Sequence, residues 1–64
     1  MAGRFTDKEC EQILLALRQE ARRQACTAGM RKTTVEQLAQ AADISKGAFY
    51  HFYASKEMLF LEVL

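Results

Sequence analysis

Apolar residues recur at every third or fourth position along most of this chain, with polar residues between them. The first such stripe consists of Cys10, Ile13, Leu14, Leu17, Ala21, Ala25 and Ala28. This spacing is typical of amphipathic helices, whereas strands alternate apolar and polar residues one by one. Proline is absent. The pattern therefore predicts an all-α fold.

The ends of the first predicted helix are marked by capping residues. Thr6 and Glu9 form a capping box, in which the threonine hydroxyl accepts from a free backbone N–H and the glutamate reaches back. Gly29 suits the position after a helix end, where a positive φ is common. We expect this helix to cover about residues 6–28.

Three shorter helices are expected next, over about residues 34–42, 45–53 and 55–64. Their N-caps are Thr33 or Thr34, then Ser45, then Ser55. The last helix is apolar almost all round, which is typical of a buried helix. We expect it to continue into a further domain, so that this chain is the N-terminal piece of a longer protein.

The second and third predicted helices fit the pattern of a helix-turn-helix. Ala39 is small enough for close packing, and Asp43 tolerates the positive φ that the turn requires. Their shared core is expected to contain Leu38, Ala42, Ile44, Phe49 and Phe52. At about 100° per residue, the opposite side of the third helix carries Lys46, Gly47, Tyr50 and His51. The pattern predicts a steeply angled helix pair whose second member presents a polar face to a DNA groove.

The composition is that of one small globular domain, with 64 residues, half of them apolar, and a net charge of +1. So small a charge neither requires nor excludes a nucleic-acid partner. Placement is more informative, because Arg31, Lys32, Lys46 and Lys56 flank or lie within the helix-turn-helix. No apolar run approaches the ~20 residues of a membrane span, and the polar N-terminus is unlike a signal peptide. We expect a cytoplasmic protein without membrane contact.

Residues suited to catalysis or metal binding are sparse. Cys10 and Cys26 fall at opposite ends of the first helix, roughly 24 Å apart, which is too far for a disulfide. Together with His51, the only histidine, they form no credible metal set. No nucleophile is paired with a base. We therefore expect no catalytic residues, no metal, no cofactor and no enzymatic activity.

From the helix-turn-helix onward the chain resembles a known family. The segment KTTVEQLAQAADISKGAFYHFYASKEMLF is similar to the DNA-binding domain of the tetracycline-repressor (TetR) family of bacterial transcription regulators. The resemblance covers about residues 13–64 and is strong from Gly29 onward, above all in the run SKGAFYHFYASKE. It implies a three-helix, homeodomain-like helix-turn-helix bundle followed by the start of a fourth helix.

The chain departs from the family pattern in two places. The turn carries Asp43 where the family usually has glycine, and the first helix ends with Gln24 and Ala25 where bulky apolar residues are usual. Aspartate tolerates left-handed backbone better than most residues, so the turn is expected to form. We expect Met30 or neighbouring aromatic residues to fill the thinner core near Gln24.

Matching this chain to the family position by position implies a set of DNA-contacting residues. The set consists of Thr33, Thr34, Ser45, Lys46, Gly47, Tyr50, His51, Tyr53 and Lys56. The hydroxyls at helix starts suit phosphate, although simple capping explains them as well. Gly47 is expected to let the DNA backbone approach. Basic and aromatic members are expected to contact bases or phosphates, with an ordinary solvated surface as the alternative. For Tyr53, both packing in the core and contact with a phosphate are open.

The resemblance implies a sequence-specific transcription regulator, more often a repressor than an activator. Such a protein binds a palindromic operator in double-stranded DNA as a homodimer. Dimerisation and binding of a small-molecule inducer are expected in a second domain outside this chain. Two other classes stay open on the residues alone, namely the DNA reader of a recombinase-type enzyme and a helical protein-interaction module.

Overall fold

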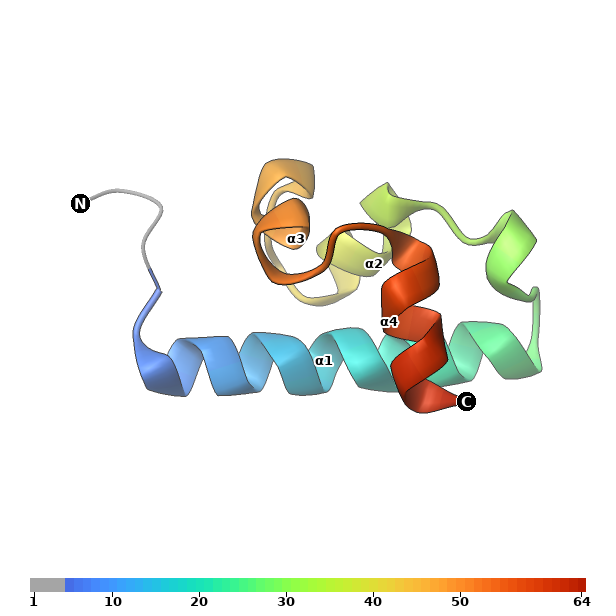
Figure 1. The fold of residues 1–64 in the computed structure, drawn as a ribbon, viewed down its shortest axis with the longest axis horizontal. Coiled ribbons are helices and arrows are strands. Elements are labelled where there is room, and N and C mark those ends of the chain that lie inside the picture. Colours follow the sequence, from blue (N-terminus) through green and yellow to red (C-terminus); the bar gives the residue numbers. More distant parts are fainter. Residues whose placement is uncertain (1–4) are drawn as a thin grey trace.

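A computed structural model of the chain describes residues 5–64, which contain four α-helices and one short 3₁₀ helix (Figure 1). These elements are α1 (Asp7–Cys26), η1 (Met30–Lys32), α2 (Val35–Ala41), α3 (Lys46–Phe52) and α4 (Lys56–Val63). The predicted all-α class is confirmed. Each α-helix lies inside the range expected from the sequence, whereas η1 was not predicted.

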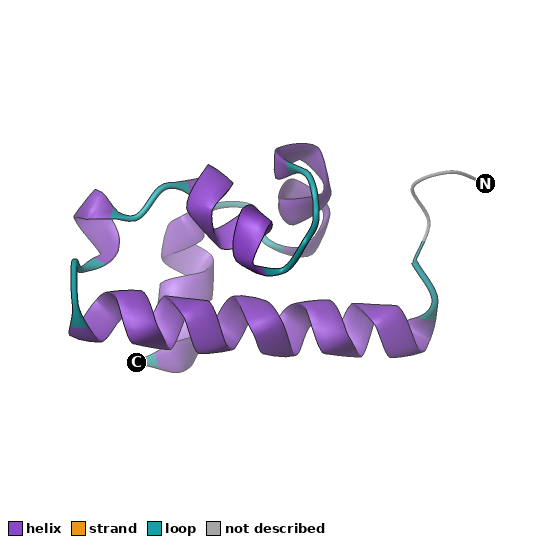
Figure 2. Ribbon diagram, turned by 180° about the vertical axis from the view of Figure 1, so that it is seen from behind, coloured by secondary structure: helices purple, strands orange, loops and turns teal. Residues whose placement is uncertain are grey.

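The long helix α1 forms the base on which the other helices are assembled. It packs against α2 and against α4, and α2 packs in turn against α3. Figure 1 shows α4 crossing α1 steeply, with α2 and α3 on one side of α1, and the view from behind in Figure 2 agrees. None of the helices in residues 5–64 is long and apolar enough to cross a membrane.

The helix starts are determined locally by hydroxyl caps. At α1, Glu9 N–H donates to Thr6 Oγ1 over 3.1 Å, and Thr6 N–H donates to Glu9 Oε1 over 2.8 Å. The same box at α2 uses Thr34, so Thr34 rather than Thr33 is the cap. Ser45 and Ser55 cap α3 and α4. Side-chain oxygens thus satisfy backbone donors that the first helical turn leaves free.

The turn between α2 and α3 is a Schellman motif centred on Asp43. Its φ is 59°, in the left-handed region that the sequence predicted. Ile44 N–H donates to Ala39 C=O over 2.9 Å, and Asp43 N–H donates to Gln40 C=O over 3.1 Å. These two bonds satisfy carbonyls at the end of α2. The turn therefore forms with aspartate in the position that glycine usually occupies.

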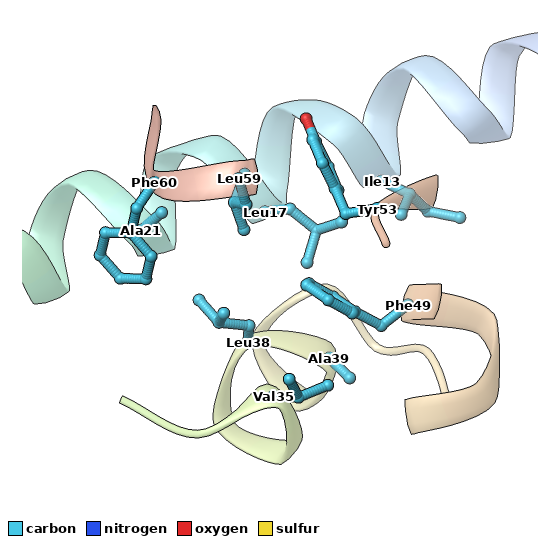
Figure 3. Close-up of a cluster of buried hydrophobic side chains, with 10 residues drawn as sticks. All are labelled: Ile13, Leu17, Ala21, Val35, Leu38, Ala39, Phe49, Tyr53, Leu59 and Phe60. Carbon is cyan, nitrogen blue, oxygen red and sulfur yellow. The ribbon is translucent and has the colours of Figure 1, made fainter. Parts of the chain in front are cut away.

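One hydrophobic core lies between the four α-helices. Figure 3 shows Leu17 and Ala21 of α1 facing Leu38 of α2, with Phe49 of α3 beside them. Leu59 and Phe60 add the contribution of α4. Met30 packs against this cluster. Phe49 and Leu38 are fully buried, so α3 is held to the rest of the domain from its inner side.

Two expectations about burial are wrong. Ala25 and Ala28 belong to the predicted apolar stripe but are exposed, because α1 buries mainly Ile13, Leu17 and Ala21 and ends at Cys26. The last helix was expected to be buried all round. Instead α4 crosses α1 and buries only one side, which leaves large apolar side chains exposed, namely Met58, Leu61 and Leu64.

Candidate nucleic-acid interface

The two sides of α3 separate its aromatic residues as the helical spacing predicted. Phe49 is fully buried, while Tyr50 keeps 48% of its surface exposed. The Tyr50 ring meets Phe49 edge-on at 5.5 Å between ring centroids, so a buried neighbour supports the exposed ring. His51 is exposed as well. The outer side of α3 therefore carries an aromatic and an imidazole ring that core packing does not require.

A groove collects several of the expected site residues from three different helices. It has a volume of about 270 Å³ and lies between the start of α2, the outer side of α3 and the start of α4. Its lining includes Glu36, Lys46, Tyr50, Ser55 and Lys56. The structure thus brings Lys46, Tyr50 and Lys56 to one surface, which we call the α3 groove.

Gly47 lies on the exposed side of α3, in the first turn of the helix. A Cβ atom added there would meet only Ser45 Oγ, at an ordinary contact distance of 3.9 Å. Alanine is favoured over glycine in helices by up to about 1 kcal/mol. Neither packing nor space within residues 5–64 therefore accounts for glycine at this position.

The two adjacent threonines have different environments. Thr34 is exposed, and its hydroxyl caps α2 by accepting from Gln37 N–H over 3.1 Å. Thr33 is fully buried, and its hydroxyl donates to the Gly29 carbonyl over 2.8 Å. Only Thr34 presents its side chain to solvent, whereas Thr33 connects the loop after α1 to the start of α2.

Lys56 is half-buried and makes two internal hydrogen bonds. Its ammonium donates to the Thr33 carbonyl over 2.7 Å and to the Met30 carbonyl over 3.0 Å. The first carbonyl lies between η1 and α2, and the second belongs to the first residue of η1. A lysine at the start of a helix opposes the helix dipole, and the sequence suggested that phosphate binding explains its presence. The structure adds a second explanation, since Lys56 joins α4 to the segment before α2.

Tyr53 follows the last turn of α3 and faces inward. It is 7% exposed, and its hydroxyl donates to Glu62 Oε1 of α4 over 2.8 Å. Arg18 of α1 donates to the same oxygen over 3.2 Å. Burial raises the pKa of Tyr53, and the bond to the Glu62 carboxylate raises it further, so the phenol remains protonated at neutral pH. Tyr53 thus ties α3 to α4 rather than lining the α3 groove.

Two charged residues outside the expected set contribute to this region. Glu36 of α2 pairs with Lys46 of α3, with 3.2 Å between Oε2 and Nζ. A hydrogen bond from its own backbone N–H, and then Lys46, lower the pKa of Glu36, so its carboxylate stays ionised. Glu62 of α4 is the second, since it accepts hydrogen bonds from Tyr53 and Arg18. Each of these two glutamates contacts residues elsewhere in the sequence, so no local sequence pattern indicated the contacts.

A buried helical core that presents one short helix with an exposed polar side is the architecture of a DNA-binding helix-turn-helix domain. Residues 17–63 match the family model for bacterial regulatory proteins of the tetR family. The match spans most of the chain, so this chain belongs to the TetR family and is a DNA-binding transcription regulator, as predicted. No curated protein and no solved structure matches the chain.

Proposed function

We propose that this domain reads a specific operator by placing the outer side of α3 in the major groove of double-stranded DNA. The observation that carries the proposal is the combination on that side of a 48% exposed tyrosine and a glycine without a packing reason. Exposed aromatic rings contact thymine methyl groups or bond phosphates, and a missing side chain lets the DNA backbone come close.

The proposed contacts follow from exposure and chemistry. Tyr50 contacts a thymine methyl or a phosphate, and Gly47 accommodates the sugar-phosphate backbone. Lys46 supplies the cation at the edge of the groove, and His51 extends the same side of α3. These four residues form the centre of the proposed interface, which we call the reading face.

Residues around the reading face hold it against phosphates. Thr34 and Ser45 are exposed at the starts of α2 and α3, where hydroxyls suit phosphate oxygens. The ammonium of Lys56 has three N–H donors, of which two are used on carbonyls, so one stays available for a phosphate. Thr33 and Tyr53 leave the proposed contact set, because both are buried and bonded internally.

At the level of the whole protein, we propose a repressor that acts as a homodimer. Two copies of α3 would enter successive major grooves of a palindromic site, about 34–36 Å apart. A small-molecule inducer bound to a second domain would change this spacing and release the DNA. The family assignment supports this arrangement, and nothing in the fold of residues 5–64 conflicts with it.

Selection of bound duplexes from a random-sequence library tests the proposal. The expected result is enrichment of one short motif, arranged as an inverted repeat when the full-length protein is used. Binding should weaken steeply with salt, because phosphate contacts release counterions. A library without enrichment would exclude sequence-specific reading and favour a helical protein-interaction module. Binding that does not depend on salt would contradict the proposed phosphate contacts.

A further inference from the structure

The α3 groove contains a carboxylate directly beside the lysine of the reading face. Lys46 Nζ donates to Glu36 Oε2 over 3.2 Å. Both side chains are largely open to solvent, with 54% of Lys46 and 64% of Glu36 exposed. The two residues come from different helices, so the pair spans the groove between α2 and α3. The ammonium group of Lys46, which would bind a DNA phosphate, is therefore already paired with the Glu36 carboxylate.

An exposed ion pair of this kind is weak and can be displaced. Double-mutant measurements on such pairs give at most about 1 kcal/mol. The Lys46 ammonium has three N–H donors, and Glu36 uses one of them. A phosphate that approaches Lys46 can therefore displace the Glu36 carboxylate or bind beside it, and in either case it lies close to a negative charge. The carboxylate opposes phosphate binding at this position without preventing it.

We propose that Glu36 competes with DNA phosphates for Lys46 and so limits the affinity of this domain for duplex DNA of arbitrary sequence. The inference rests on the proposed function of the reading face. Non-specific complexes depend almost entirely on neutralised phosphates, whereas operator complexes add contacts to base edges. A carboxylate that engages Lys46 therefore lowers the affinity of the complex that depends on phosphate contacts alone.

The chain provides a matched control for this inference. Glu57 lines the same α3 groove from the first turn of α4. None of the three ion pairs within residues 5–64 involves Glu57. Glu36→Gln and Glu57→Gln remove the same charge from the same surface, but only the first of them frees Lys46. A comparison of the two separates competition for Lys46 from a general change in net charge.

The test measures binding of a labelled mixed-sequence duplex of about 20 base pairs by fluorescence anisotropy. Glu36→Gln should bind about threefold more tightly than the parent chain at about 50 mM salt. Its plot of log affinity against log salt should be steeper by about 0.9, the value for one additional phosphate contact. Glu57→Gln should give a smaller gain and no such change in slope. In a Lys46→Gln background, the gain from Glu36→Gln should fall to that of Glu57→Gln.

Three results would overturn the inference while the proposed function stands. The first is an equal gain from Glu36→Gln and Glu57→Gln, and the second is a gain from Glu36→Gln that persists without Lys46. The third is weaker binding by Glu36→Gln, which would indicate that Glu36 positions Lys46 or accepts a hydrogen bond from a cytosine. A parent chain that binds no duplex even at low salt would refute the proposed function together with the inference.

Discussion

The two tyrosines of this chain lie three positions apart and face opposite surroundings. Tyr50 is 48% exposed on the reading face, whereas Tyr53 is 7% exposed and bonded to Glu62. The same side chain thus serves two different purposes, in α3 and at its C-cap. Phe49 on the inner side of α3 and Tyr53 just after the helix hold α3 against the rest of the domain. The outer side, with Tyr50 and its neighbours, is free for a partner. Stability and DNA binding should therefore respond to different substitutions.

The largest effect is expected from removing the anchor on the inner side. Phe49 is fully buried, and Phe49→Ala should lower the free energy of unfolding by about 3–5 kcal/mol. A domain of this size has a total stability of the same order, so most of the variant should be unfolded at 25 °C. Circular dichroism during urea titration measures this. A folded Phe49→Ala variant with an unchanged midpoint would break the distinction between the two sides.

The reading face should show the opposite behaviour. Tyr50→Ala should weaken binding to the selected operator about ten- to a hundredfold, because it removes a ring that contacts the DNA. Its urea midpoint should stay close to that of the parent, since exposed substitutions usually change stability by less than about 0.5 kcal/mol. A joint measurement of anisotropy and denaturation tests this. Loss of binding with equal loss of stability would assign Tyr50 a structural role instead.

Removing the hydroxyl from each tyrosine in turn compares their surroundings more finely. Tyr53→Phe removes the hydrogen bond to Glu62 and should cost about 1 kcal/mol of stability, with little change in DNA affinity. Tyr50→Phe is the matched change on the other side and should leave stability unaltered. Urea midpoints of the two variants provide the measurement. Equal destabilisation by both would mean that the two hydroxyls have equivalent surroundings.

The smallest effect on stability is expected at Gly47, where a substitution should stabilise the domain instead of destabilising it. A Cβ atom there meets only Ser45 Oγ at 3.9 Å. Gly47→Ala should therefore raise the free energy of unfolding, by about 1 kcal/mol at most. The same methyl group should weaken operator binding, because it occupies space that the DNA backbone needs. Thermal melting and anisotropy measure the two quantities. A variant that is more stable and binds equally well would show that DNA does not approach this position closely.

Features determined by neighbouring residues were predictable from the sequence. The capping box at Thr6, a threonine cap at residue 33 or 34, the left-handed turn at Asp43 and the division between Phe49 and Tyr50 all depend on groups within five positions of each other. Their outcome is therefore fixed by local geometry and helical spacing, and the structure agrees with each of them.

Features determined by distant parts of the chain were not predictable in this way. The few polar residues of α4 do not gather on one side of the helix, so its contacts decide which side is buried, and Leu61 ends on the surface. A lysine has a long and flexible side chain, and only the assembled fold places Lys56 beside the Thr33 carbonyl. The pair of Glu36 and Lys46 likewise depends on how α2 and α3 pack together.

The central claim is that the outer side of α3 meets DNA while its inner side does not. Because Tyr50 and Tyr53 are the only tyrosines, proton NMR of their ring resonances during titration with the selected duplex tests it directly. The Tyr50 ring signals should shift progressively, and the Tyr53 signals should stay nearly unchanged. Unchanged Tyr50 signals in a duplex-bound protein, or shifts confined to Tyr53, would contradict the claim.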